Sequence, residues 1–114
     1  MIVVILRIQT ASVHRAEIVE LIRPIIGPTE AQPGCLLFRL YSETDDDDAL
    51  VLLQEWRSQE DLDKFIRSRD FKRILAAMDL ASQPPVFTIN TVSSRSGMEL
   101  VERLRLSSQV IEST

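Results

Sequence analysis

Few side chains in this sequence could take part in chemistry, and several of them occur only once. His14 is the only histidine, Trp56 the only tryptophan, Tyr41 the only tyrosine and Cys35 the only cysteine. An imidazole titrates near neutral pH, so His14 is a candidate general base if it lies beside a pocket. Its predicted place in the first turn of a helix favours exposure to solvent instead. A single cysteine excludes an internal disulfide and is typical of a reducing compartment, so we expect a cytoplasmic protein.

Polar and aromatic residues in or at the ends of predicted strands are candidate substrate ligands. The indole of Trp56 could stack on a planar aromatic substrate and donate one hydrogen bond, or it could be a core residue that joins sheet and helix. Tyr41 could bind a substrate hydroxyl, and Arg39, two residues earlier on the same strand face, could bind an anionic group. The alternatives are a phenol in water and an ion pair between subunits. Asn90 could orient substrate or dioxygen, or it could bond to a neighbouring strand or across an interface.

Metal and cofactor signals are weak. The acidic run 45–48 lacks the glycine and the distal glutamate of an EF-hand loop, so we predict a solvated turn. One histidine and one cysteine do not suffice for a typical zinc site. The chain carries no glycine-rich phosphate loop, nucleophile elbow or flavin motif, and we predict no metal and no cofactor. A net charge of −4 gives no electrostatic footprint for nucleic acid or an anionic membrane, and we predict neither as a partner.

Apolar patterning and turn residues define the elements that must position these side chains. Strands are predicted at four segments rich in branched apolar residues, which are Ile2–Ile8, Cys35–Tyr41, Ala49–Trp56 and Val86–Val92. Ser12 is expected to cap a first helix, which Pro24 and the Gly27-Pro28 pair should kink or end. A capping box at Ser58 precedes a short helix, and a second helical stretch follows from Phe71. The element order is β-α-β-β-α-β, which predicts an α+β, ferredoxin-like domain over residues 1–92.

The predicted strands are apolar at consecutive positions, so both faces of the sheet are apolar. An antiparallel sheet usually has one dry and one solvated face. Two helical segments can cover only one face, so we predict that a second copy covers the other and that the protein is a homodimer. The alternative is that the tail, residues 93–114, folds back over the same face. That tail carries a capping box at Ser96 and Glu99 and apolar residues three apart, so we predict a helix there that packs on the dimer partner.

Several short motifs resemble the antibiotic biosynthesis monooxygenase family. They are Pro33-Gly34-Cys35, the strand end Leu40-Tyr41, the strand end Leu53-Gln54-Glu55-Trp56 and Phe71-Lys72, and their order and spacing extend the resemblance over about residues 2 to 92. The resemblance implies a dimeric α+β barrel with a pocket in each subunit between sheet and helices. It also implies that some relatives are cofactor-independent monooxygenases that oxidise phenolic or quinol-like aromatics. Where haem-degrading relatives carry their functional groups this chain has Leu6, Phe65 and Leu75, so that activity is not expected.

The same resemblance implies a pocket lined by Trp56 and by Phe65. Many relatives carry histidine where this chain has Asp70, and a carboxylate could replace that base only if burial raised its pKa. The alternative for Asp70 is a helix cap. We therefore weigh a monooxygenase that acts on a small aromatic substrate, with Asp70 or His14 as base, against a non-catalytic small-molecule-binding or stress-associated homodimer. A cavity at Trp56 and Phe65 with a polar group inside would favour the enzyme, and a filled core would favour the binding protein.

Overall fold

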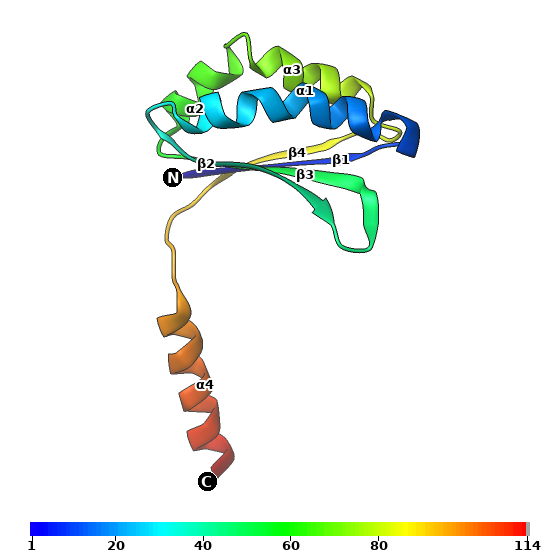
Figure 1. The fold of residues 1–114 in the computed structure, drawn as a ribbon. Helices are drawn as coiled ribbons and strands as arrows, with labels where there is room; N and C mark the ends of the chain where they lie inside the picture. Colours follow the sequence, from blue (N-terminus) through cyan, green and yellow to red (C-terminus); the bar gives the residue numbers. More distant parts are fainter. Residues whose placement is uncertain (114) are drawn as a thin grey trace.

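The structure is a computed structural model that describes residues 1–113, with side chains described as far as residue 107. One antiparallel sheet has the strand order β2-β3-β1-β4, formed by β1 (Ile2–Gln9), β2 (Cys35–Glu43), β3 (Asp46–Trp56) and β4 (Val86–Thr91). Three helices cover one face of it, namely α1 (Ser12–Glu30), α2 (Gln59–Ile66) and α3 (Phe71–Asp79) (Figure 1). A fourth helix, α4 (Met98–Ser113), stands away from this body. The predicted α+β, ferredoxin-like fold is confirmed.

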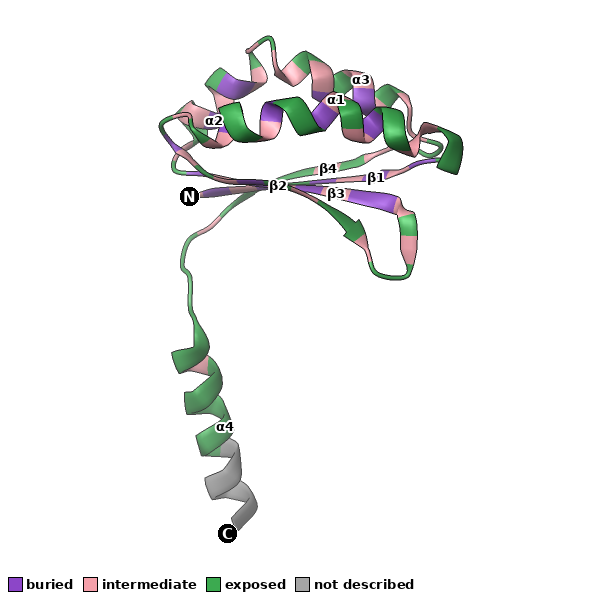
Figure 2. Ribbon diagram, in the orientation of Figure 1, coloured by how far each residue is buried: buried purple, intermediate pink, exposed green. Residues whose placement is uncertain are grey.

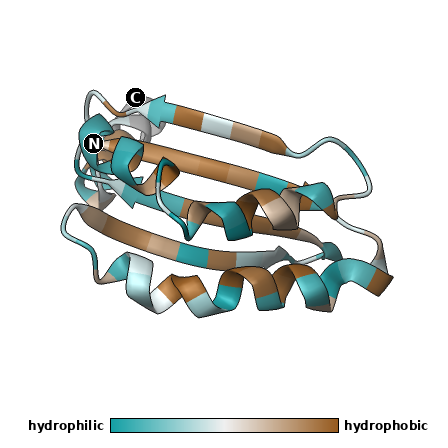
Figure 3. Ribbon diagram, turned by 90° about the horizontal axis from the view of Figure 1, so that it is seen from above, coloured by the Kyte–Doolittle hydropathy of each residue, from teal (hydrophilic) through white to brown (hydrophobic). Residues whose placement is uncertain are grey.

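The core lies between the sheet and the three covering helices (Figure 2). Alternate residues of β1, which are Ile2, Val4, Leu6 and Ile8, point into it and are at most 4% exposed. The strands are mostly hydrophobic along their length, whereas hydrophobic and hydrophilic residues alternate along the covering helices (Figure 3). This contrast reflects the 3.6-residue helical period, which allows each helix to bury one stripe. Within residues 1–113, no helix is both long and apolar enough to cross a membrane.

The opposite face of the sheet, here called the open face, has no helix over it (Figure 1). Its residues are the other alternate set of each strand, and in the register Ile5 lies between Leu53 of β3 and Thr88 of β4. Ile5 is 39% exposed although it lies at the centre of the sheet. The two apolar faces predicted from the sequence are therefore present. The alternative in which the tail covers the open face is not what the structure shows, because α4 extends away from the sheet.

Helix α1 does not end at Pro24 or at the Gly27-Pro28 pair, and its N-cap is not Ser12. The helix continues past Pro24 to Glu30, because the carbonyl that Pro24 leaves without an N–H partner finds another donor. The guanidinium of Arg73 donates to the carbonyl oxygen of Glu20 at 3.1 Å and to that of Leu21 at 2.7 Å. At the other end, the N-cap is Ala11, which has no capping side chain. The hydroxyl of Ser12 instead donates to the Asp48 carboxylate at 2.5 Å, so Ser12 joins helix to strand.

The acidic run is also shorter as a turn than predicted. Only Thr44 and Asp45 form the turn, and β3 already begins at Asp46. The Asp46 carboxylate accepts hydrogen bonds from the Gln9 side-chain amide and from the backbone N–H of Asp48, both at 3.0 Å. The prediction of a turn over 45–48 is therefore wrong for residues 46–48, which belong to β3, whereas Asp45 and Asp47 are exposed to solvent as predicted.

The capping predictions gave mixed results. Ser58 is the N-cap of α2 and its hydroxyl accepts from the backbone N–H of Asp61, which confirms that prediction. Ser96 caps nothing, since α4 begins at Met98 and the Glu99 carboxylate accepts from the N–H of Gly97 at 2.9 Å. The predicted tail helix thus exists, but the residue before it that contacts Glu99 is Gly97.

Candidate functional site

An aromatic cluster lies beneath the helices at one end of the sheet. The rings of Trp56 and Phe65 are stacked, with centroids 5.2 Å apart and planes 26° apart. Phe38 and Phe71 meet Phe65 edge-on at 5.6 and 5.8 Å, and Phe87 meets Phe71 edge-on at 6.4 Å. Trp56 lies at the end of β3, Phe65 on α2 and Phe71 at the start of α3. The structure therefore brings together two predicted substrate ligands, Trp56 and Phe65.

A polar side chain that sequence reasoning missed lies inside this cluster. Gln54 is fully buried, and its Oε1 accepts a hydrogen bond from the Trp56 indole N–H at 2.9 Å. Its Nε2 is buried without a hydrogen-bond partner among the described residues. A buried N–H without an acceptor destabilises the folded state by about 1–3 kcal/mol. The signal was available in the sequence, because Gln54 has the same strand parity as Leu52 and Trp56 and so had to face the core.

The core around this cluster is filled. Trp56 is 0% and Phe65 1% exposed. Two grooves open elsewhere, and neither is lined by Trp56 or Phe65. One, of about 240 Å³, lies between α1 and β2 and includes Arg15 and Tyr41. The other, of about 310 Å³, lies between α1 and α3 and includes Asp70.

Tyr41 and Arg39 lie on β2, the edge strand. Tyr41 is 49% exposed and lines the groove between α1 and β2. Arg39 forms an ion pair with Glu30 at the end of α1, and its guanidinium also donates to the carbonyl of Phe38 at 3.2 Å. The charge of Arg39 therefore already has a carboxylate partner within its own chain.

Asn90 lies on the other edge strand, β4, and is exposed. It is paired with Val3, and its Nδ2 donates to the Val3 carbonyl at 3.2 Å and to the Thr88 hydroxyl at 3.4 Å. Val3 has the strand parity of the open face, so Asn90 lies on the opposite side of the sheet from Trp56. Asn90 thus bonds to a neighbouring strand and does not meet the aromatic cluster.

The two candidate bases, His14 and Asp70, lie at the starts of two different helices. His14, in the first turn of α1, has a side chain 45% exposed and Nδ1 3.7 Å from a Glu17 carboxylate oxygen. Trp56 pairs with Ile2, whereas Gln9, next to the start of α1, pairs with Ala49. About seven residues of strand, roughly 23 Å, therefore separate the His14 end of the sheet from Trp56. Asp70 is the N-cap of α3 without a capping hydrogen bond, and it precedes Phe71 of the aromatic cluster.

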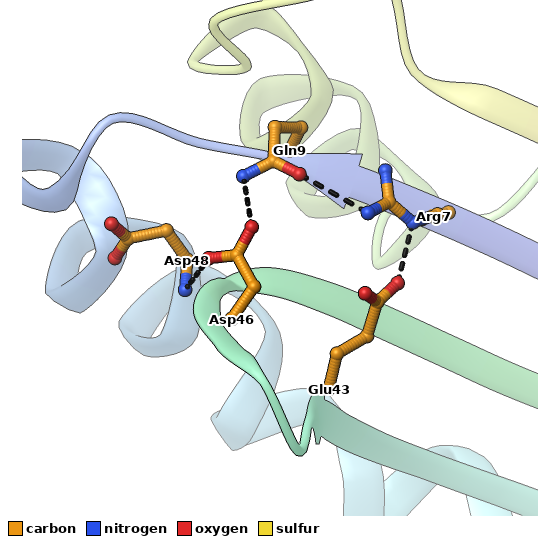
Figure 4. Close-up of polar contacts among 5 residues, drawn as sticks. All are labelled: Arg7, Gln9, Glu43, Asp46 and Asp48. Carbon is orange, nitrogen blue, oxygen red and sulfur yellow. Dashed lines mark hydrogen bonds and ion pairs between the residues drawn. The ribbon is translucent and has the colours of Figure 1, made fainter.

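A polar network links the hairpin end of the sheet to β1 (Figure 4). The Arg7 guanidinium donates to the Glu43 carboxylate at 2.5 Å and to the side-chain oxygen of Gln9 at 3.1 Å. Gln9 in turn donates to Asp46. The hydrogen bond to Glu43 raises the pKa of Arg7. The network belongs to the open face, not to the aromatic cluster.

Metal-binding groups are sparse. Among the side chains that the structure describes, no group of three or more His, Cys, Asp and Glu residues could hold a metal ion. Cys35 is half-buried at the start of β2, and burial raises the pKa of its thiol. The thiol donates to the Leu37 carbonyl oxygen at 3.6 Å. These features favour a protonated, unreactive thiol.

Comparison with solved structures supports the fold. A protein from Mycobacterium tuberculosis, Rv0793, is 26% identical, with a TM-score of 0.75 over 84% of this chain and 98% of that chain. A conserved protein from Methanosarcina mazei Go1 is 27% identical, with a TM-score of 0.73 over 78% of this chain and 89% of that one. An antibiotic biosynthesis monooxygenase is 19% identical, with a TM-score of 0.74 over 82% of this chain and all of that one. No functionally curated protein matches the chain significantly.

The sequence of the chain also matches the model of a protein family. The family model described as antibiotic biosynthesis monooxygenase matches residues 1–77, which include β1, α1, the β2–β3 hairpin, α2 and most of α3. The matched segment contains Gln54, Trp56, Phe65 and Asp70. It excludes β4 and α4. This chain belongs to the antibiotic biosynthesis monooxygenase family.

Proposed function

We propose that this protein is a cofactor-independent monooxygenase that acts on a small aromatic, quinol-like or phenolic substrate. The observation that carries the proposal is the unpartnered Nε2 of Gln54 beside the stacked rings of Trp56 and Phe65. A flat aromatic ligand that carries an oxygen acceptor would satisfy that N–H and gain ring contacts at the same time. Membership of a monooxygenase family supports the same assignment.

The chemistry that this site could support follows from the donor set. Both amide hydrogens of Gln54 are donors and its oxygen is already taken by Trp56, so the site favours a carbonyl or a phenolate oxygen over a hydroxyl that must donate. A donor aimed at that oxygen stabilises the substrate anion, which is electron-rich enough to reduce dioxygen. One oxygen atom then forms a carbon–oxygen bond in the product and the other leaves as water, with all electrons supplied by the substrate.

The base that forms the anion is Asp70 in this proposal. Asp70 directly precedes Phe71, whose ring packs on Phe65, whereas His14 lies at the other end of the sheet. Tyr41, Arg39 and Asn90, which we also predicted as substrate ligands, lie outside the cluster. They would contribute only if a second subunit brought them to a neighbouring site.

Access requires the aromatic cluster to open, since Trp56 and Phe65 are fully buried. Phe65 lies on α2, which has only 8 residues and packs beside the loop that leads into α3. The buried side chains of α2 are Leu62 and Phe65, so movement of this helix would break the ring contacts of Phe65, and ring contacts with a bound substrate would replace them. We propose that α2 and Phe71 separate to admit the substrate.

A second function remains in competition, and a specific observation favours it. The filled core at Trp56 and Phe65, together with Asp70 in place of the family's histidine, is the arrangement expected of a non-catalytic small-molecule-binding or stress-associated homodimer. In either case we propose a homodimer through the open face and a location in the cytoplasm. The partly exposed Ile5 at the centre of that face, next to the partly exposed Leu53, supports the dimer, because a second subunit would bury both side chains.

Calorimetry and an oxygen electrode together test the proposal. A panel of planar quinols, phenols and quinones should include ligands that bind saturably, and some should consume oxygen with an equal amount of product. Gln54→Leu should weaken binding about tenfold or more, because it removes the donor. Gln9→Leu, which removes an amide from the opposite face, is the matched control and should leave binding unchanged. Thermal melting of both variants checks that each is folded.

The outcomes separate the two functions. Binding that depends on Gln54 without oxygen consumption would establish the non-catalytic alternative. Absence of heat with every ligand, or equal binding by Gln54→Leu, would show that the aromatic cluster is only a core. Trp56→Phe should abolish any fluorescence change and reduce affinity in calorimetry, since the stacking surface becomes smaller.

A further inference from the structure

Helix α4 has an apolar stripe that nothing in the described chain covers. Met98 is 64%, Val101 48% and Leu104 59% exposed. Side chains three or four residues apart lie on the same side of a helix, so these three form one stripe. A helix of 16 residues that packs on nothing is marginally stable in water. Packing of the stripe against a partner would therefore stabilise the helix.

The path of the tail places α4 on the open side of the sheet. After β4 ends at Thr91, the Val92 N–H donates to the Met1 carbonyl at 2.9 Å. The Arg95 guanidinium then donates to the Glu55 carboxylate at 2.6 Å. Glu55 pairs with Val3 on the open face, so the linker is bound at the end of that face where β3 finishes. From there α4 runs away from the covering helices (Figure 1).

The other end of the open face carries the acidic hairpin. The β2–β3 hairpin bends toward the same side of the sheet as α4, at the opposite end (Figure 1). Asp45 and Asp47 are exposed at its tip, and the Ser12–Asp48 hydrogen bond holds the start of α1 beside it. Next to Ser12 lies Val13, which is 80% exposed and is the most exposed of the large apolar side chains described. This end of the subunit thus combines negative charge with an unburied apolar residue.

We propose that α4 of one subunit docks on the hairpin end of a second copy of this chain. The inference rests on the proposed homodimer, in which two open faces meet about a two-fold axis that runs across the strands. Such an axis brings the tail end of one subunit to the hairpin end of its partner. The apolar stripe of α4 then covers Val13, and Arg105, which follows Val101 by four residues and flanks the stripe, meets Asp45 and Asp47. Two α4 contacts form per dimer because the interface is isologous.

One charged side chain of α4, Arg105, favours the acidic hairpin as the docking site. Arg105 is exposed and shares the side of the helix that Val101 occupies, whereas Arg103 lies two residues away on the opposite side. The chain as a whole is acidic, with a net charge of −4, and five of its acidic residues lie within residues 43–48. Helix α4 is not cationic as a whole, since it carries Glu99 and Glu102 as well as Arg103 and Arg105. The acidic hairpin is therefore proposed as the partner of one side chain, Arg105, on the side of the helix that the apolar stripe occupies. Two solved relatives match 98% and 100% of their own length to 84% and 82% of this chain, so part of this chain has no counterpart in either.

Sedimentation across nanomolar to micromolar concentrations tests the contact. The full chain should be a dimer, and a chain that ends at Gly97, which keeps the Arg95–Glu55 contact, should dissociate at least about tenfold more readily. Arg105→Glu should raise the dissociation constant several-fold, and Arg103→Glu, the matched control on the same helix, should not. Combining Arg105→Glu with Asp47→Lys in one chain should restore dimerisation, because the charges are then exchanged.

Failure of this inference is distinguishable from failure of the dimer. A full-length chain that is monomeric throughout would refute both. A dimer whose dissociation constant is unchanged by truncation at Gly97 would refute the docking of α4 alone and leave the dimer standing. If Arg105→Glu has no effect, or if Asp47→Lys does not rescue it, the hairpin is not the docking site. Amide NMR spectra of each variant show whether the domain remains folded.

Discussion

The two faces of the central sheet are built from neighbouring residues of the same strands, yet they are in different states. Leu52 faces the helices and is 1% exposed, whereas Leu53 faces the open side and is only partly covered by its own strand neighbours. Both are leucines in the middle of β3, and each pairs with a residue of β1. The difference shows that the helices bury the apolar centre of one face of the sheet and leave the apolar centre of the other face partly exposed.

The two faces also differ in whether their polar groups have hydrogen-bond partners. The helix face holds the buried Gln54, whose Nε2 lacks an acceptor. On the open face, charged side chains are paired with one another, as in the Arg7–Glu43 and Arg95–Glu55 ion pairs at its two ends. An apolar centre with a polar rim is the layout of a protein interface. The unsatisfied polar group lies on the helix face instead, where it supports the proposed ligand site.

Replacing one leucine at a time gives the largest expected effect and tests the comparison directly. Leu52→Ala should lower the free energy of unfolding by about 2–5 kcal/mol at any protein concentration, because it leaves a cavity in a completed core. Leu53→Ala should lower it less in dilute solution, and should mainly raise the dissociation constant of the dimer. Urea denaturation at two protein concentrations measures both effects. Equal losses of stability that do not depend on concentration would mean that the open face is not an interface.

A smaller loss of stability is expected from a change in the layer of helices that covers the sheet. Arg73→Met should lower the free energy of unfolding by about 1–3 kcal/mol, because the Glu20 and Leu21 carbonyls then lose a charged donor. Methionine keeps most of the aliphatic volume of the side chain, so packing changes little. Lys72→Met, one residue earlier on α3, is the matched control, and urea denaturation should show almost no change. Similar losses in the two variants would show that the capping of α1 across Pro24 contributes little.

Features of the fold that depend on residues close together in the sequence could be predicted, whereas features that depend on distant residues could not. Strand positions and their order followed from runs of branched residues, and Ser58 was correctly identified as a cap because its partner is three residues away. The continuation of α1 past Pro24 could not be predicted, since the donor Arg73 is more than fifty positions away in the chain. The start of β3 was misjudged for the same reason, because Gln9 binds Asp46 only after the strands have paired.

The candidate site followed a similar rule. Trp56 and Phe65 were expected together, and they are stacked. The other predicted ligands do not join them, because the strand order places β2, with Tyr41 and Arg39, at one edge of the sheet and β4, with Asn90, at the other. Gln54 has the same strand parity as Trp56, so the sequence alone indicates that its side chain faces the core.

The smallest expected effect concerns the start of α4, the helix that extends away from the sheet on the side of the open face (Figure 1). Two backbone N–H groups, those of Gly97 and of Glu99 itself, bond to the Glu99 carboxylate and lower the pKa of Glu99. A carboxylate at a helix N-terminus also interacts favourably with the helix dipole. Because the pKa is lowered in the folded helix, this contribution is present above the ordinary glutamate pKa and is lost as the pH falls through the lowered one.

Carboxyl NMR titration measures this effect at the residue itself. The midpoint for Glu99 should lie below the ordinary value of about 4.3, and the helical chemical shifts of residues 98–101 should weaken over the same acidic range. Glu99→Gln keeps an acceptor but removes the charge, so the first turn of α4 should remain and its pH dependence should vanish. Ser96→Ala is the matched control, since the structure gives Ser96 no capping role, and it should leave the Glu99 midpoint where it is. A midpoint that rises in Ser96→Ala would show instead that the Ser96–Glu99 capping box predicted from the sequence forms in solution, and with it a helix that begins one residue earlier than Met98.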